Sequence, residues 1–132
     1  MKKSDGFLNV DLEISARTRA VLAPLIDALD GTLFELYRGR LGHAYHVHYE
    51  VRGCARSAST TIHELAAKIE ALGPAARRAW KAATLRDFNV GVELERGVKA
   101  IELAIDREAS RRIVELGGRL VFTAYQVSAM SR

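Results

Sequence analysis

The chain has few of the residues that cross-link or anchor small proteins. Its 132 residues include a single cysteine, Cys54, so no internal disulfide can form, and no set of cysteines and histidines with zinc-site spacing surrounds it. No apolar run approaches the roughly 18 residues of a membrane-spanning helix, and Met1 leads into an alternating segment rather than an apolar signal sequence. We therefore expect a cytoplasmic protein that does not contact a membrane.

The motifs of common enzyme classes are also missing. The sequence has no Gly-x-Ser-x-Gly elbow, no Walker loop and no dinucleotide-binding glycine fingerprint. Cys54, beside Arg52 and Arg56, is a candidate nucleophile with His43 or His63 as its base, but the spacing selects neither pairing. We predict no catalytic residue and no cofactor, and the sequence leaves open whether the chain is an enzyme.

The composition is that of an ordinary globular domain. Hydrophobic residues make up 48% and charged residues 27% of the chain, which suffices for a core without cross-links, so residues 1–132 are predicted to form a single domain. The net charge of +4 is unevenly placed, since between Arg52 and Arg86 seven Lys or Arg stand against two acids. Such an excess is typical of a site for an anionic partner or of the solvated side of amphipathic helices.

Periodicity predicts most of the secondary structure. In residues 7–14, the alternating apolar side chains indicate a strand with one buried and one open face; they are Leu8, Val10, Leu12 and Ile14. An apolar stripe predicts a helix over 17–29. The next predicted elements are strands over 32–38 and 43–52 and helices over 62–72 and 74–84, the first of these helices from the capping-box spacing of Thr61 and Glu64.

The last third of the chain predicts a hairpin, a helix and a final strand. Alternation marks a strand over 88–94 and its hairpin partner over 101–105; Asp106 then caps a helix, and a strand follows over 120–127. The predicted order is β-α-β-β-α-α-β-β-α-β. This order favours the α+β class, with an antiparallel sheet, helices packed on one face, and a ferredoxin-like or related fold.

The same segment carries a resemblance. The run Phe88-Asn-Val-Gly-Val-Glu-Leu and the later run Leu116-Gly-Gly-Arg-Leu-Val-Phe-Thr-Ala-Tyr125 are similar to an uncharacterised bacterial domain of unknown function. The similarity covers about the last third of the chain and consists of structural positions. It implies the α+β fold and no activity, because it carries over no catalytic residue.

The polar sides of the strands are the predicted binding surface. Alternation in the 43–52 strand places His46, His48 and Glu50 on the side away from the helices. We therefore expect a small, non-catalytic binding or regulatory module that acts through protein–protein or small-ligand contacts on this open face. The predicted lining residues are Asp11, Glu13, Tyr37, His46, His48 and Tyr125.

A metal-dependent enzyme is one alternative interpretation. Imidazoles two residues apart on a strand can converge on one divalent ion, and Glu50 lies on the same side as His46 and His48. Such a site needs further ligands and supporting hydrogen bonds. Polar residues on the wet side of a sheet give the same pattern without a metal.

A nucleic-acid-binding domain is the other alternative. The helix over 74–84 and the two residues after it carry four cations that could contact phosphates, with Trp80 stacking on a base; they are Arg77, Arg78, Lys81 and Arg86. However, Trp80 shares a helical face with Ala76, Ala79 and Ala83, which favours a place in the core.

The final strand indicates a partner. Both of its sides are apolar, with Leu120 and Phe122 on one side and Val121 and Tyr125 on the other. A strand with one face in water needs apolar side chains only on its other, buried face. We expect a homodimer or a protein partner to cover it, or a segment of the same chain to do so.

Overall fold

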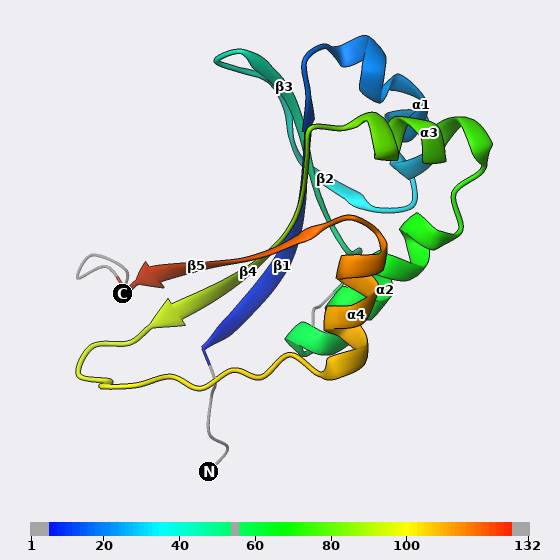
Figure 1. The fold of residues 1–132 in the computed structure, drawn as a ribbon. Coiled ribbons are helices and arrows are strands. Elements are labelled where there is room, and N and C mark those ends of the chain that lie inside the picture. The colour runs from blue at the N-terminus through cyan, green and yellow to red at the C-terminus, as the bar shows by residue number, and fades with distance from the viewer. Residues whose placement is uncertain (1–5, 54–55, 128–132) are drawn as a thin grey trace.

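The computed structural model describes residues 6–53 and 56–127, which form a five-stranded sheet with all the helices on one face (Figure 1). In chain order the elements are β1 (Phe7–Ala16), α1 (Arg19–Leu29), β2 (Phe34–Leu41), β3 (Ala44–Glu50), α2 (Ala58–Glu70), α3 (Pro74–Ala82), β4 (Leu85–Leu94), α4 (Arg107–Glu115) and β5 (Arg119–Gln126). Cys54 lies outside the described residues.

The sheet is mixed, which corrects the prediction that it is antiparallel. The strand order is β2-β3-β1-β4-β5, and the pairs β2–β3, β3–β1 and β1–β4 are antiparallel. β4 and β5 are parallel, because α4 carries the chain back across the sheet before β5 begins. The α+β class and the packing of the helices on one face are confirmed (Figure 1).

The predicted strand over 101–105 is wrong, and with it the predicted order of elements. Residues 95–106 form an irregular connection, which we call the 95–106 segment, and they pair with no strand in the described part of the chain. β4 has no edge left for a hairpin partner, because β1 pairs with one side of it and β5 with the other. Leu103 and Ile105 instead pack against the rim of the core.

The core lies between the sheet and two helix pairs. α1 packs against α3, and α2 packs against α4, over the same face of the sheet (Figure 1). The inward side chains of β1 and β4 meet the buried stripes of these helices, as the periodicity predicted. The largest fully buried side chains include Leu12, Ile14, Leu22, Leu25, Ile62, Leu65 and Phe88.

Two predicted details at the N-terminal ends of elements are wrong. Helix α2 begins at Ala58 rather than Ile62, because the Ser57 hydroxyl accepts a hydrogen bond from the Thr60 backbone N–H and caps the helix earlier. Leu8 is 47% exposed rather than buried. A register shift between Phe7 and Asn9 places a bulge at Leu8, which breaks the alternation of β1.

Candidate functional site

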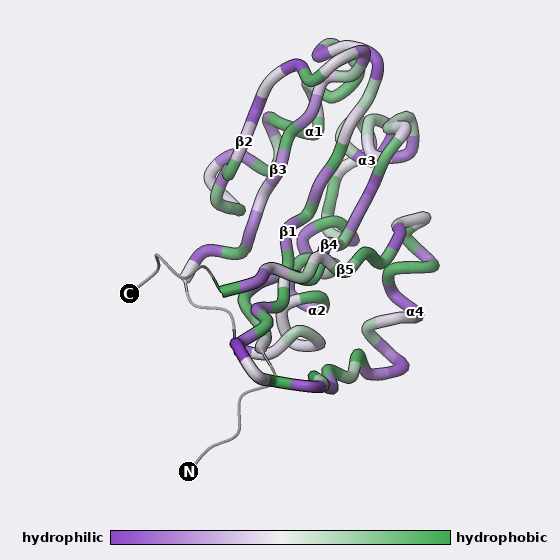
Figure 2. The backbone as a smooth tube through the Cα atoms, turned by 90° about the vertical axis from the view of Figure 1, so that its left-hand side faces the viewer, coloured by the Kyte–Doolittle hydropathy of each residue, from purple (hydrophilic) through white to green (hydrophobic). Residues whose placement is uncertain are grey.

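The face of the sheet that points away from the helices forms the candidate site, and we call it the open face. Figure 2 views the sheet from the side away from the helices and shows hydrophilic and hydrophobic residues alternating along the strands. The register aligns the outward residues of neighbouring strands, so that Glu13 lies opposite His48 on β3 and opposite Asp87 on β4. Asp11 lies opposite Asn89. The structure therefore brings together side chains from three strands, β1, β3 and β4.

A cluster of three rings occupies the β2–β3 side of the open face. The rings of His46 and His48 meet edge to face with centroids 5.5 Å apart, and the ring of Tyr37 lies 5.6 Å from that of His48. His48 Nε2 is 3.4 Å from His46 Nδ1. Burial is the main factor that lowers the pKa of His48, and the neighbouring His46 lowers it further, while Glu13 opposes both. The neutral imidazole is thus favoured.

Asp11 is the most perturbed carboxyl group of the open face. Burial raises its pKa to about 6, and the charges of Glu13 and Glu50 add to the effect. Glu50 accepts a hydrogen bond from the side chain of Asn9. Asp11 has no such donor among the described side chains, so these side chains compensate its negative charge poorly.

A chain of hydrogen bonds connects Glu13 to β5. Asn89 Nδ2 donates to both carboxylate oxygens of Glu13, at 3.2 and 3.3 Å. The Thr123 hydroxyl in turn donates to Asn89 Oδ1 at 2.8 Å. These bonds fix the Glu13 carboxylate in place, so this acidic group is held rigidly on the sheet.

An ion pair and an exposed tyrosine lie on the β4–β5 side. Arg119 binds Asp87 through two hydrogen bonds of 2.9 and 3.0 Å, and the Asp87 side chain is only 5% exposed. Tyr125 lies over Gly91, where a Cβ atom would come within 3.5 Å of the tyrosine ring. All six residues predicted to line the open face therefore lie on it, with Tyr37 and Tyr125 on opposite sides.

The histidines and Glu50 do not form a metal site with a full set of ligands. Within residues 6–53 and 56–127, no group of three or more His, Cys, Asp or Glu side chains is arranged to hold a metal ion. His46 and His48 face each other, whereas Glu50 is bound by Asn9. The metal hypothesis stays a prediction that rests on two imidazoles.

The predicted basic helix is shorter than expected, because α3 ends at Ala82 and Arg86 lies on β4. Two of the four predicted cations are used within the fold. Arg77 donates to the carbonyl oxygens at the end of α2, and Arg86 donates to those of Trp80 and Ala83 at the end of α3. Trp80 is 2% exposed and its indole N–H donates to the Leu116 carbonyl at 2.8 Å, which confirms its place in the core. Arg78 and Lys81 remain exposed, as a phosphate contact requires.

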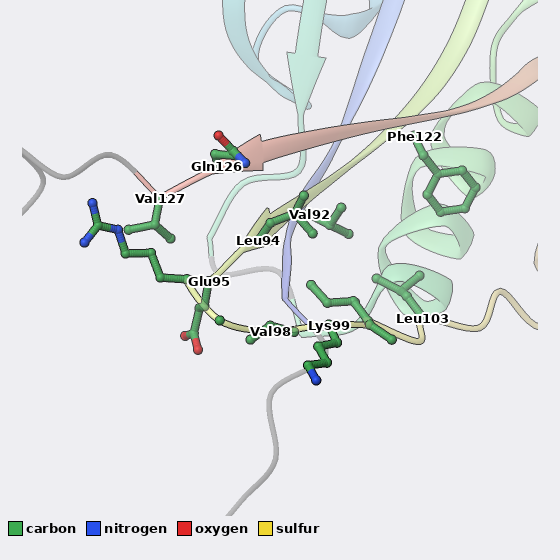
Figure 3. Close-up of a pocket in the computed structure, with 13 residues that line it drawn as sticks. Val92, Leu94, Glu95, Val98, Lys99, Leu103, Phe122, Gln126 and Val127 are labelled. Carbon is green, nitrogen blue, oxygen red and sulfur yellow. The ribbon is translucent and has the colours of Figure 1, made fainter.

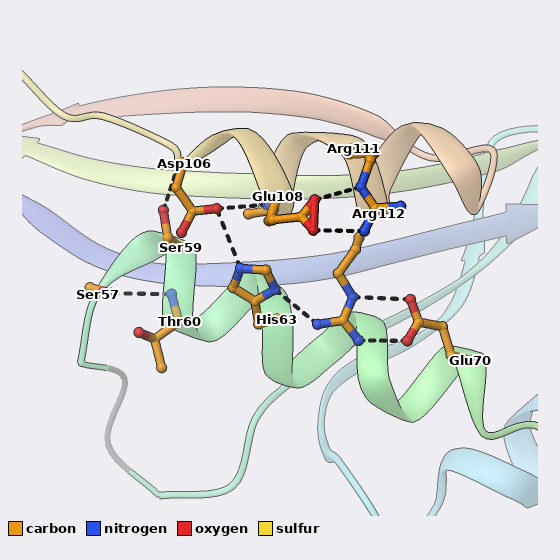
Figure 4. A network of polar contacts seen from close by, with 10 residues as sticks. Ser57, Ser59, Thr60, His63, Glu70, Asp106, Glu108, Arg111 and Arg112 are labelled. Atoms are coloured by element: carbon orange, nitrogen blue, oxygen red, sulfur yellow. Dashed lines mark hydrogen bonds and ion pairs between the residues drawn. The ribbon is translucent and has the colours of Figure 1, made fainter.

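A polar network joins α2 to α4 (Figure 4). The sequence analysis did not predict it. Arg112 donates to His63 Nδ1 at 2.8 Å and also binds Glu70. Since a guanidinium can only donate, His63 carries its proton on Nε2 and donates it to Asp106, which is 3.3 Å away. Asp106 also caps α4 by accepting from the Ala109 N–H. The network joins residues more than forty positions apart and has a structural role.

A cavity of about 880 Å³ lies on the opposite face of the sheet, beneath the 95–106 segment. Phe122 from β5 and Leu103 from the segment face each other across it (Figure 3). Val92, Leu94 and Val98 add apolar lining, while charged residues of the segment lie at its rim. The sequence-based prediction missed this cavity because it placed a paired strand there.

No protein-family model, curated protein or solved structure matches the chain. Among the described residues, no helix is both long and apolar enough to cross a membrane. The assignment of function therefore depends on the geometry of the open face.

Proposed function

We propose that the protein is a small, non-catalytic binding module whose open face holds a cationic group of its partner. The observation that carries the proposal is the half-buried carboxyl of Asp11, which lies between the acids Glu13 and Glu50 and has no ion-pair partner among residues 6–53 and 56–127. A charge arrangement that destabilises the folded protein is characteristic of functional sites, because a bound ligand can compensate it.

The charges of the open face support a cationic partner. The outward positions of the five strands include several carboxylates, namely Asp11, Glu13, Glu50, Asp87 and Glu93. Arg119 is the single Lys or Arg at those positions in the described strands, and Asp87 already neutralises it. The whole chain has a net charge of +4, so this acidic surface is a local feature.

The aromatic side chains support the same partner chemistry. Tyr37 is 37% exposed and Tyr125 is 51% exposed, and they lie on either side of the acids. Tyrosine faces attract guanidinium and ammonium groups. An arginine or lysine side chain, or a small amine, would thus meet carboxylates at the centre and rings at the sides.

The order of the strands supports a ferredoxin-like core. The first four strands are arranged β2-β3-β1-β4 with antiparallel neighbours, and α1 connects β1 to β2 while α2 and α3 connect β3 to β4. A β-α-β-β-α-β unit of this kind is the ferredoxin-like motif. On this interpretation α4 and β5 are an addition that widens the open face. The single cysteine suits a reducing compartment, and we propose the cytoplasm.

Calorimetric titration at low ionic strength tests the proposal. The probes are a short arginine peptide, a glutamate peptide of the same length, and free arginine, which separates a protein partner from a small ligand. We expect the arginine peptide to bind and the glutamate peptide not to bind. Binding should strengthen as the pH rises through about 6, because Asp11 then becomes charged.

Matched variants locate the binding. The double variant Asp11→Asn, Glu13→Gln should weaken binding of the arginine peptide by about tenfold or more. Glu108→Gln removes an exposed acid on the helical side and should change the affinity by less than about twofold. The proposal fails if neither cationic probe binds, or if the double variant and the control bind equally well.

A further inference from the structure

We propose that the outer edge of β5 is an interface through which two copies of this chain pair antiparallel into one continuous sheet. The inference uses the edge of the sheet rather than its open face. Tyr125 belongs to both surfaces, but association of the chain is measured without any cationic probe, so the two proposals can fail separately.

Among the residues that the structure describes, none pairs with the outer edge of β5. β5 is the last strand of the sheet, and eight of its residues pair in unbroken register with Asp87–Leu94 of β4. Backbone groups of alternate residues therefore point away from β4. No backbone hydrogen bond from this edge to another described residue is present. Such an edge is a template for a further strand.

The two edges of the sheet differ in their protection against pairing. The other edge strand, β2, carries the charged residues Glu35, Arg38 and Arg40 and a register shift next to Leu36. Charges and bulges are the devices by which natural edge strands avoid pairing. β5 has no proline, no register shift and no charged residue after Arg119. Its edge is thus open to pairing where that of β2 is not.

The side chains of β5 complement their own copies. Odd-numbered residues lie on the open face and even-numbered residues on the helical face. The two-fold axis that relates two antiparallel copies is perpendicular to the sheet. The open faces of both copies therefore lie on the same side of the joined sheet, and odd-numbered residues meet odd-numbered residues. With the axis at Thr123, Val121 lies opposite Tyr125 of the second copy, and Phe122 lies opposite Ala124. In both of these pairs a large side chain meets a small or β-branched one, which favours pairing.

The charges of the edge also permit a second copy to approach. Arg119 is the one charged residue of β5, and Asp87 of the same chain binds it through two hydrogen bonds. Two copies therefore meet without repulsion between like charges. The pairing would also shield Phe122 and Tyr125, each of which is 51% exposed in the single chain.

Sedimentation equilibrium over a range of protein concentrations tests the inference. We expect the unaltered protein to associate to twice its 14.6 kDa chain mass. Tyr125→Lys places a charge on the β5 edge and should raise the dimer dissociation constant by about tenfold or more. The matched control Phe34→Lys changes an equally exposed aromatic residue on the β2 edge and should leave the constant within about twofold.

Hydrogen exchange of the unaltered protein gives a second readout that needs no variant. Exchange of the outward backbone N–H groups of β5 should slow as the protein concentration rises, while that of β2 should not change. The inference is overturned if the protein is monomeric at every concentration, if Phe34→Lys dissociates the dimer and Tyr125→Lys does not, or if exchange in β5 is independent of concentration.

Discussion

The substitution Asp11→Asn should stabilise the protein at neutral pH. The half-buried Asp11 has its pKa raised from 3.8 to about 6 by burial and by Glu13 and Glu50, so the folded protein holds this proton more tightly than the unfolded chain does. The stability contributed by the protonated carboxyl is therefore lost as the pH rises from about 4 to about 6. Asparagine keeps the shape of the side chain and removes the charge.

The magnitude follows from the size of the pKa change. A rise from 3.8 to about 6 corresponds to about 3 kcal/mol, and solvent screening of a half-exposed group reduces this to about 1–2 kcal/mol. Asp11→Asn should thus raise the free energy of unfolding by about 1–2 kcal/mol above pH 6, and by nearly nothing below about pH 4. Urea denaturation of both proteins across this pH range measures the difference.

A matched control isolates the environment of Asp11. Asp27 is exposed on α1, and Asp27→Asn should change the free energy of unfolding by no more than about 0.5 kcal/mol at any pH. If Asp11→Asn is neutral at pH 7, or destabilises the protein there, the interpretation of Asp11 as an uncompensated charge is wrong.

Two further substitutions test the packing that supports the open face. Arg112→Ala should lower the free energy of unfolding by about 1 kcal/mol, because it removes the ion pair with Glu70 and the His63 contact between α2 and α4. The control Arg111→Ala removes only exposed ion pairs within α4 and should lower it by about 0.5 kcal/mol or less. Leu12→Ala should cost about 2–5 kcal/mol, and Leu8→Ala less than about 1 kcal/mol, as measured by thermal unfolding; equal costs would contradict the bulge at Leu8.

The elements that depend on local pattern could be predicted from the sequence. The alternation in β1 and β3 divided their residues correctly between core and open face from Val10 onward. Asp106 was recognisable as the cap of α4, and Pro74 as the first residue of α3. In each case the signal lies within a few residues of the feature that it determines.

The features that depend on distant parts of the chain could not be predicted. The alternation of 101–105 is real, but whether it forms a strand depends on which segment takes the free side of β4, and β5 takes it. The bulge at Leu8 depends on the pairing of β1 with β4. The contacts among His63, Arg112 and Asp106 arise because α2 and α4 pack together, and no local pattern reports that.

The most direct test of the central claim, that the open face is the binding surface, is a map of backbone amide chemical shifts during titration with an arginine peptide. We predict that the shifts concentrate on the outward residues around Asp11, including Glu13, His48 and Asn89. Shifts confined to the cavity beneath the 95–106 segment or to α3, with β1 and β3 unchanged, would contradict the claim.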